Sequence, residues 1–105
     1  MSISYPPATA KVAGSVNVTQ VALQFNPALI LAANPNRCAG TLIINNCPNP
    51  LSINLGAADA TLNGATNITI PGGGGTYDVP SSYYGSISGV TTNPGGNVKI
   101  VEPTA

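Results

Sequence analysis

Short apolar runs separated by turn-forming residues limit most strongly what this chain can fold into. Residues 34–50, NPNRCAGTLIINNCPNP, show the pattern: an apolar run from Thr41 to Ile44 lies between segments rich in Asn and Pro. Such runs return roughly every ten residues with turn signals between them, as short strands do. We therefore expect an all-β fold of about seven to eight short strands, an antiparallel β-sandwich of the jelly-roll-like kind or, alternatively, a small barrel.

The alternation of apolar and polar residues indicates where the strands lie. Val16 and Val18 occupy one alternation phase and Val21 the other, which predicts a β-bulge or a tight turn near Gln20. The strands at 42–44 and 51–55, with an Asn- and Pro-rich turn between them, give the clearest β-hairpin signal. One stretch, 55–62, also allows a single turn of helix. The expected strands are 16–25, 28–33, 42–44, 51–55, 68–70, 77–79, 84–90 and 98–101.

The chain has 105 residues, which is enough for one domain with one hydrophobic core. Residues 1–14 carry Pro6, Pro7 and Gly14 among small residues and are expected to form an extended N-terminal arm. Residues 15–105 are expected to form a single β-sandwich domain.

Charged residues are almost absent. Three basic and three acidic residues give a formal net charge of zero, and there is no His. Without net positive charge the chain lacks the long-range attraction that brings proteins to nucleic acid or to anionic membranes. Without His it lacks the residue most used for acid–base catalysis and zinc binding. Neutral polar residues stand where charges are usual, which favours contact with other proteins; a surface that uses Asn and Thr simply to face solvent is the alternative.

The N-terminus, MSISYPP, lacks the basic start and the apolar run of a secretory signal. The longest uncharged apolar stretch, residues 28–33, is six residues long and too short to span a bilayer. We therefore expect a soluble chain made in the cytoplasm and no membrane partner.

Two cysteines, Cys38 and Cys47, bracket the expected strand at 42–44. At about 3.3 Å per strand residue their backbones lie roughly 30 Å apart, whereas a disulfide needs Cα atoms within about 7 Å. We expect two free thiols that behave as small apolar side chains. A bridge within a loop and a bond to a symmetry mate are the alternatives.

Three motifs suggest chemistry, and each has a simpler interpretation. The segment PGGGGT at 71–76 lacks the Lys and the following helix of a phosphate-binding loop, so we expect a loop between strands. Asp59 and Asp78 have no neighbour in sequence that would tune a catalytic carboxylate. A metal site lacks ligands beyond the two cysteines. We expect no catalytic residue, no cofactor, no metal and no enzymatic activity.

Contact with other proteins is therefore the expected role of the candidate site. Three tyrosines near the Gly-rich segment are expected at a sandwich rim or subunit contact, with a sugar-binding platform as the alternative. Arg37 is expected either to bind a backbone carbonyl or a neighbour's carboxylate through its planar guanidinium, or to be plainly exposed. The candidate interface residues are Tyr5, Pro6, Pro7, Arg37, Tyr77, Tyr83 and Tyr84.

Turn and strand motifs recur in a characteristic order between residues 20 and 102. Asn34-Pro-Asn-Arg37 is followed by an apolar strand, an Asn-rich turn and a strand that ends Ile53-Asn-Leu-Gly56. Pro71-Gly-Gly precedes Tyr77, and Tyr84-Gly-Ser-Ile87 and a closing Gly-Asn-Val-Lys-Ile-Val-Glu102 come later. This order resembles a group of small β-sandwich virion structural proteins of tailed bacteriophages. The two cysteines and the scarcity of aromatic residues depart from that pattern.

The resemblance implies a structural role on a virus particle and brings no catalytic residues. It implies a capsid cement or decoration protein that binds the major capsid protein on the outer surface of the phage head and stabilises capsomer junctions. By analogy, copies of the chain are expected to associate as a homotrimer. The alternative is a head-fibre, neck or tail accessory module with a receptor- or glycan-binding role. The expected location is the virion, without a nucleic-acid partner.

Overall fold

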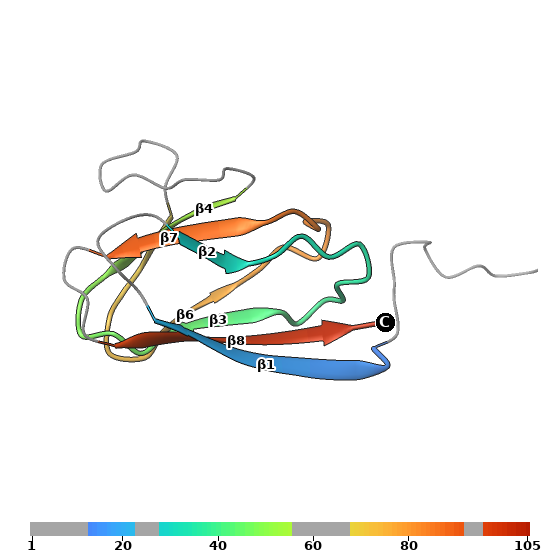
Figure 1. Ribbon diagram of the computed structural model, residues 1–105, viewed down its shortest axis with the longest axis horizontal. Helices are drawn as coiled ribbons and strands as arrows, with labels where there is room; N and C mark the ends of the chain where they lie inside the picture. The colour runs from blue at the N-terminus through green and yellow to red at the C-terminus, as the bar shows by residue number, and fades with distance from the viewer. Residues whose placement is uncertain (1–12, 23–27, 56–67, 92–95) are drawn as a thin grey trace, which may run out of the picture.

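Two antiparallel sheets of four strands pack face to face in the computed structural model of this chain (Figure 1). The structure describes residues 13–22, 28–55, 68–91 and 96–105. The predicted all-β antiparallel sandwich is confirmed, and the described residues contain no helix. The strands are β1 (Ser15–Ala22), β2 (Ala28–Leu31), β3 (Leu42–Asn45), β4 (Leu51–Leu55), β5 (Ile68–Ile70), β6 (Gly75–Asp78), β7 (Ile87–Thr91) and β8 (Asn97–Thr104).

The strands pair in a nested order along the chain. β1 pairs with β8, β2 with β7, β3 with β6, and β4 with β5, all antiparallel. β8 also pairs with β3, and β7 with β4, which gives a first sheet of order β1-β8-β3-β6 and a second of order β2-β7-β4-β5. As a result β1 and β2 are both edge strands.

Strand alternation builds an aliphatic core between the sheets. In β8, Val98 and Ile100 are fully buried while the alternating residues Lys99 and Val101 are not, as expected when successive side chains point to opposite faces. Ile100 lies opposite Ile43 of β3 in the register, and both have no exposed surface. Each large aliphatic side chain buried in this way contributes about 1.5–3 kcal/mol.

The hairpin predicted for residues 42–55 is wrong, because β3 and β4 lie in different sheets. Both strands bury one face, and the chain between them crosses the sandwich as an arch so that Ile43 and Ile53 meet in one core instead of lying side by side. Asn45, at the end of β3, stabilises this arch: its Nδ2 donates to the carbonyls of Asn49 (2.9 Å) and Ile70 (3.1 Å). A turn signal between two strands does not distinguish a hairpin from an arch, since both reverse the chain.

The Gly-rich segment is a loop between β5 and β6 over residues 71–74, as predicted, but its last two residues, Gly75 and Thr76, begin β6. Gly73 and Gly74 have φ angles of 72° and 102°, which side-chain-bearing residues rarely adopt. Their N–H groups donate to the carbonyls of Cys47 and Asn45, each at 2.8 Å. The loop therefore binds the β3–β4 arch through its backbone N–H groups.

The β-bulge predicted near Gln20 is also wrong. β1 pairs with β8 in continuous register from Ser15 opposite Thr104 to Ala22 opposite Asn97. The register shifts instead in β2, between Leu29 and Leu31. The change of apolar phase in β1 arises because the strand carries apolar residues on both of its faces.

Several strand ends differ from the prediction, and some expectations concern residues outside those described. The strand expected at 28–33 ends at Leu31, and the strand expected at 77–79 spans Gly75–Asp78 instead. The strand expected at 84–90 begins only at Ile87, and the strand expected at 98–101 extends to Thr104 because β1 pairs along its whole length. Leu55 ends β4, whereas 56–62 of the proposed helical turn lie outside the described residues. So do residues 1–12 of the arm; Gly14 donates its N–H to the Thr104 carbonyl at 2.8 Å and so extends the β1–β8 ladder.

Candidate functional site

A groove of about 640 Å³ runs between the edge strands β1 and β2. β1 forms one wall, while β2 and the three residues that follow it form the other, and Glu102 of β8 lies at its base. Apolar and neutral polar side chains make up the rest of the lining: Val16, Asn17, Val18, Thr19, Val21, Ile30, Leu31, Ala32, Ala33 and Asn34.

The β1 wall has an open strand edge. Its eight residues, SVNVTQVA, include no charge and no Pro, and all except Val21 are exposed. Natural proteins usually protect such an edge with Lys, Pro, a bulge or a short strand, since its free N–H and C=O groups pair readily with another extended chain. β1 has none of these features, so this edge is suited to accept a strand from another protein segment.

A buried ion pair lies beneath the groove. The Arg37 guanidinium is 2% exposed and its Nε lies 2.8 Å from Glu102 Oε2. Nη2 donates to the Ala32 carbonyl at 2.7 Å, and Nη1 donates to the carbonyls of Tyr83 (3.1 Å) and Gly85 (3.0 Å). The planar guanidinium thus binds a carboxylate and three backbone carbonyls at once, so its charge is paired and four of its five N–H donors are bound within the chain.

This cluster joins three segments that are far apart in the sequence. The turn before Arg37 is as predicted: the Arg37 N–H donates to the Asn34 carbonyl at 3.1 Å, and Asn36 N–H donates to Asn34 Oδ1 at 2.9 Å. The guanidinium then connects this turn to the end of β8 and to the loop between β6 and β7. The cluster holds Glu102, one of the residues that line the groove.

The expectation that Arg37 binds a backbone carbonyl is confirmed, but the expectations of exposure or of a contact with a neighbouring chain do not fit. Arg37 is buried, and its carboxylate partner is Glu102 of the same chain, 65 positions away. The sequence offered no local sign of this pairing.

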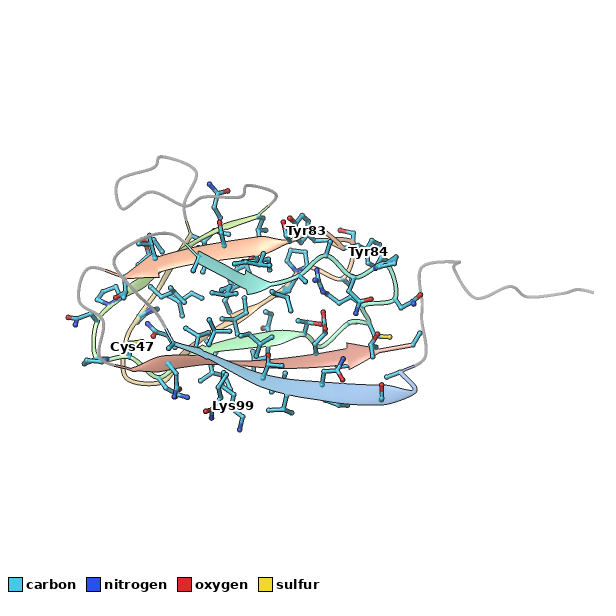
Figure 2. The ribbon with its side chains drawn as sticks, viewed as in Figure 1. Cys47, Tyr83, Tyr84 and Lys99 are labelled. Carbon is cyan, nitrogen blue, oxygen red and sulfur yellow. The ribbon has the colours of Figure 1, made fainter. Side chains whose placement is uncertain are left out.

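The tyrosines do not form one exposed platform. Tyr77 of β6 and Tyr83 both pack against the core, and burial raises the pKa of Tyr77. The Tyr83 hydroxyl donates to the Ser86 carbonyl. Tyr84 is half-buried, and its carbonyl accepts the Asn34 N–H at 2.9 Å, next to the groove. Figure 2 places Tyr83 and Tyr84 at one end of the sandwich, between the sheets and the loop that carries them. Tyr5, Pro6 and Pro7 lie outside the described residues.

The two cysteines are free and buried, as predicted. The thiol of Cys38 contacts the Asn36 carbonyl at 3.6 Å, and that of Cys47 contacts the Asn97 carbonyl at 3.7 Å. Burial raises the pKa of the Cys47 thiol. Both therefore act as small core residues at opposite ends of β3.

The described residues contain neither a cluster of metal ligands nor a membrane-spanning helix. No three side chains among the His, Cys, Asp and Glu residues at 13–22, 28–55, 68–91 and 96–105 lie together as metal ligands would. The same residues include no helix with the length and hydropathy needed to cross a membrane.

Sequence reasoning missed Glu102 and Asn45. Both lie one residue beyond the strands expected at 42–44 and 98–101. Glu102 shares its alternation phase with Val98 and Ile100, and Asn45 shares its phase with Ile43, so extending each strand by one residue would have indicated that both face inward. That signal identifies a buried polar residue but not its partner.

Comparison with protein-family models, with curated proteins and with solved structures finds no match to this chain.

Proposed function

We propose that this chain is a non-enzymatic virion structural protein, a capsid cement or decoration protein that binds the major capsid protein on the outer surface of a phage head and stabilises capsomer junctions. In this proposal copies of the chain associate as a homotrimer. We interpret the nested strand order as jelly-roll-like connectivity.

The observation that carries the proposal is the open edge of β1 beside the groove. An uncharged strand edge of eight residues offers main-chain hydrogen bonds to an extended segment of another protein, and the groove offers pockets for its side chains. Binding of this kind needs few charges, which is consistent with a chain that has six charged residues in all, three basic and three acidic.

The buried polar groups support a rigid structural module. Arg37 and Glu102 bind one another, and Asn45 binds the arch, so these polar side chains act within the fold. A module held in one conformation loses little conformational entropy when it binds a particle surface.

Quantitative mass spectrometry of gradient-purified particles tests the proposal by comparing the copy number of this chain with that of the major capsid protein. We expect comparable abundance. A copy number of a few per particle would instead favour the head-fibre, neck or tail accessory role, and absence from particles would contradict a virion role.

A variant of the β1 edge tests the surface. Gln20→Pro removes an N–H from the open edge, because the backbone groups of Asn17, Thr19 and Val21 face β8, and its ring obstructs an added strand, so particle binding should fall. Gln20→Val keeps the edge N–H and serves as the matched control. Cooperative unfolding of both variants is measured in parallel, and equal particle binding by the two would exclude the β1 edge as the binding surface.

A further inference from the structure

The outer face of the first sheet is apolar, although the solvent face of an antiparallel sheet is ordinarily polar. Because Val98 and Ile100 of β8 point into the core, Lys99 and Val101 point outward. Figure 2 shows Lys99 directed away from the second sheet. The strand register extends this face across β1, β3 and β6.

An apolar strip crosses the face from β1 to β3. Val18 lies beside Val101, and Val101 lies beside Leu42. One row away, Ile44 lies beside Lys99. Val18 is 56% exposed, whereas apolar residues on the inner face of the same sheet, such as Ile43 and Val98, have no exposed surface. The apolar strip consists of Val16, Val18, Leu42, Ile44, Val101 and Pro103.

Two opposite charges lie on either side of β3. Asp78 on β6 is the outward neighbour of Leu42, and Lys99 on β8 is the outward neighbour of Ile44. β6 and β8 are two strand spacings apart, about 10 Å. Among the described residues neither charge takes part in an ion pair.

A face with opposite charges on its two flanks and an apolar centre is complementary to itself. When a second copy is turned to face the first across Leu42 and Ile44, the Lys99 flank of each copy meets the Asp78 flank of the other. Such a contact uses the same patch on both copies and closes a dimer, so a trimer would have to use a different surface. Exposed apolar patches of this kind mark interaction surfaces, and paired charges fix their orientation.

We propose that the outer face of the first sheet packs against the same face of another copy of this chain, with the apolar strips in contact and Lys99 of each copy opposite Asp78 of the partner subunit. This surface adjoins the β1–β2 groove and shares Val16 and Val18 with it, whereas Leu42, Ile44, Val101, Asp78 and Lys99 lie outside the groove. The inference goes beyond the proposed virion role, since the contact forms between isolated chains without a particle.

A charge-swap experiment on the purified chain tests this contact. Sedimentation equilibrium measures the Kd of self-association for the wild type, for Lys99→Asp, for Asp78→Lys and for the double variant. Each single swap places like charges opposite one another and is expected to raise Kd about tenfold or more. The double variant restores opposite charges and is expected to return Kd to within about threefold of the wild-type value.

Two further variants test whether a change in Kd depends on where on the surface a charge is added. Thr69→Asp adds a charge to an exposed position of the second sheet and is expected to leave Kd unchanged. Val18→Asp puts a charge into the apolar strip and is expected to weaken association at least as much as a single swap. Cooperative urea unfolding of every variant confirms that each is folded.

Several results would overturn the proposal. A wild-type chain that stays monomeric at millimolar concentration would do so, as would a double variant no tighter than the single ones. If the chain is monomeric but the same variants reduce binding to capsids, the face belongs to a different protein partner and a second copy is the wrong occupant. A chain that associates as described yet is absent from particles contradicts the virion role and supports the assignment of this face.

Discussion

At the scale of single residues, one ion pair organises a chain that has very few charges. Arg37 and Glu102 lie in the interior, where an unpaired charge is costly, and each is the other's ionic partner. The guanidinium also binds the Ala32 carbonyl and two carbonyls of the β6–β7 loop. A polar cluster with all of these contacts made holds the turn, the loop and β8 in one arrangement.

Replacing Arg37 by Met is expected to lower the free energy of unfolding by about 3–5 kcal/mol, because Glu102 is then a buried charge without a partner and three carbonyls lose their donor. Urea unfolding at neutral pH measures the change. Arg37→Lys keeps the charge but not the planar donors and should recover only part of the loss. The double variant Arg37→Met with Glu102→Leu removes both charges and should be more stable than Arg37→Met alone. A loss below about 1 kcal/mol for Arg37→Met would contradict a structural role for the pair.

Cys47 predicts a dependence of stability on alkaline pH. Burial raises the pKa of its thiol in the folded chain, so the folded state holds this proton to higher pH than the unfolded state does. The protonated thiol therefore contributes fully to the free energy of unfolding below the pKa of the unfolded thiol, about 8.5. This stabilisation is lost as pH rises toward the pKa of the thiol in the folded chain. Burial also raises the pKa of Tyr77, so deprotonation of its hydroxyl lowers the free energy of unfolding in the same way at higher pH.

Urea unfolding at pH 7.5, 8.5 and 9.5, with reductant present, is expected to show falling stability across this series, by at most about 1.4 kcal/mol per pH unit for one thiol. Cys47→Ala should lower stability at every pH but show a smaller fall. An identical slope in the wild type and in Cys47→Ala would show that this thiol does not titrate with unfolding.

At the scale of elements, the β3–β4 arch decides the topology. Asn45 has no exposed surface; its Nδ2 shares hydrogens with three carbonyls, and its Oδ1 accepts the Cys47 N–H at 3.0 Å. The backbone of the Gly-rich loop binds the same arch. The crossing from one sheet to the other is thus held by hydrogen bonds to a single side chain and to one loop.

Asn45→Ala is expected to lower the free energy of unfolding by about 2–4 kcal/mol, because it leaves a buried N–H and several buried carbonyls without partners. Chemical denaturation followed by circular dichroism measures the loss. The adjacent Asn46 is exposed, so Asn46→Ala is the matched control and should change stability by less than about 0.5 kcal/mol. Equal effects of the two substitutions would exclude Asn45 as the stabilising residue of the arch.

At the scale of the whole molecule, the sandwich has a hydrogen-bonded boundary at Gly14. The Gly14 N–H donates to Thr104, next to the first rung of the β1–β8 ladder. This contact joins Gly14 to the sandwich, so the arm predicted for residues 1–14 is shortened to end at residue 13 or earlier. The fold gives a truncation point that the composition alone did not.

Deletion of residues 1–12 is expected to leave a sandwich that unfolds in one cooperative transition, because the described strands and their core are kept. If the arm contributes to assembly, particle binding measured by co-sedimentation should weaken. A deletion that starts the chain at residue 16 removes Gly14 and Ser15 from the ladder and should lower stability as well. Unchanged particle binding by the 1–12 deletion would remove the arm from the proposed interface.

The sequence by itself determined the fold class, most of the strands and the turns. Alternation in β8 and β4, the Asn34 turn and the Gly-rich loop are local features, since they depend on residues within one strand or turn. The free state of the two cysteines followed equally from local spacing. The alternation phase of Glu102 could have indicated its burial, but the expected strand ended at residue 101.

Only the tertiary structure decided which strands pair and what Arg37 contacts. β3 meets β8 and β6 instead of β4, and Arg37 meets Glu102 across 65 positions of sequence. The groove exists because β1 and β2, in different sheets, become edges on the same side. These features depend on the free energy of contacts between distant segments, and local alternation gives the same pattern for every way of pairing the strands.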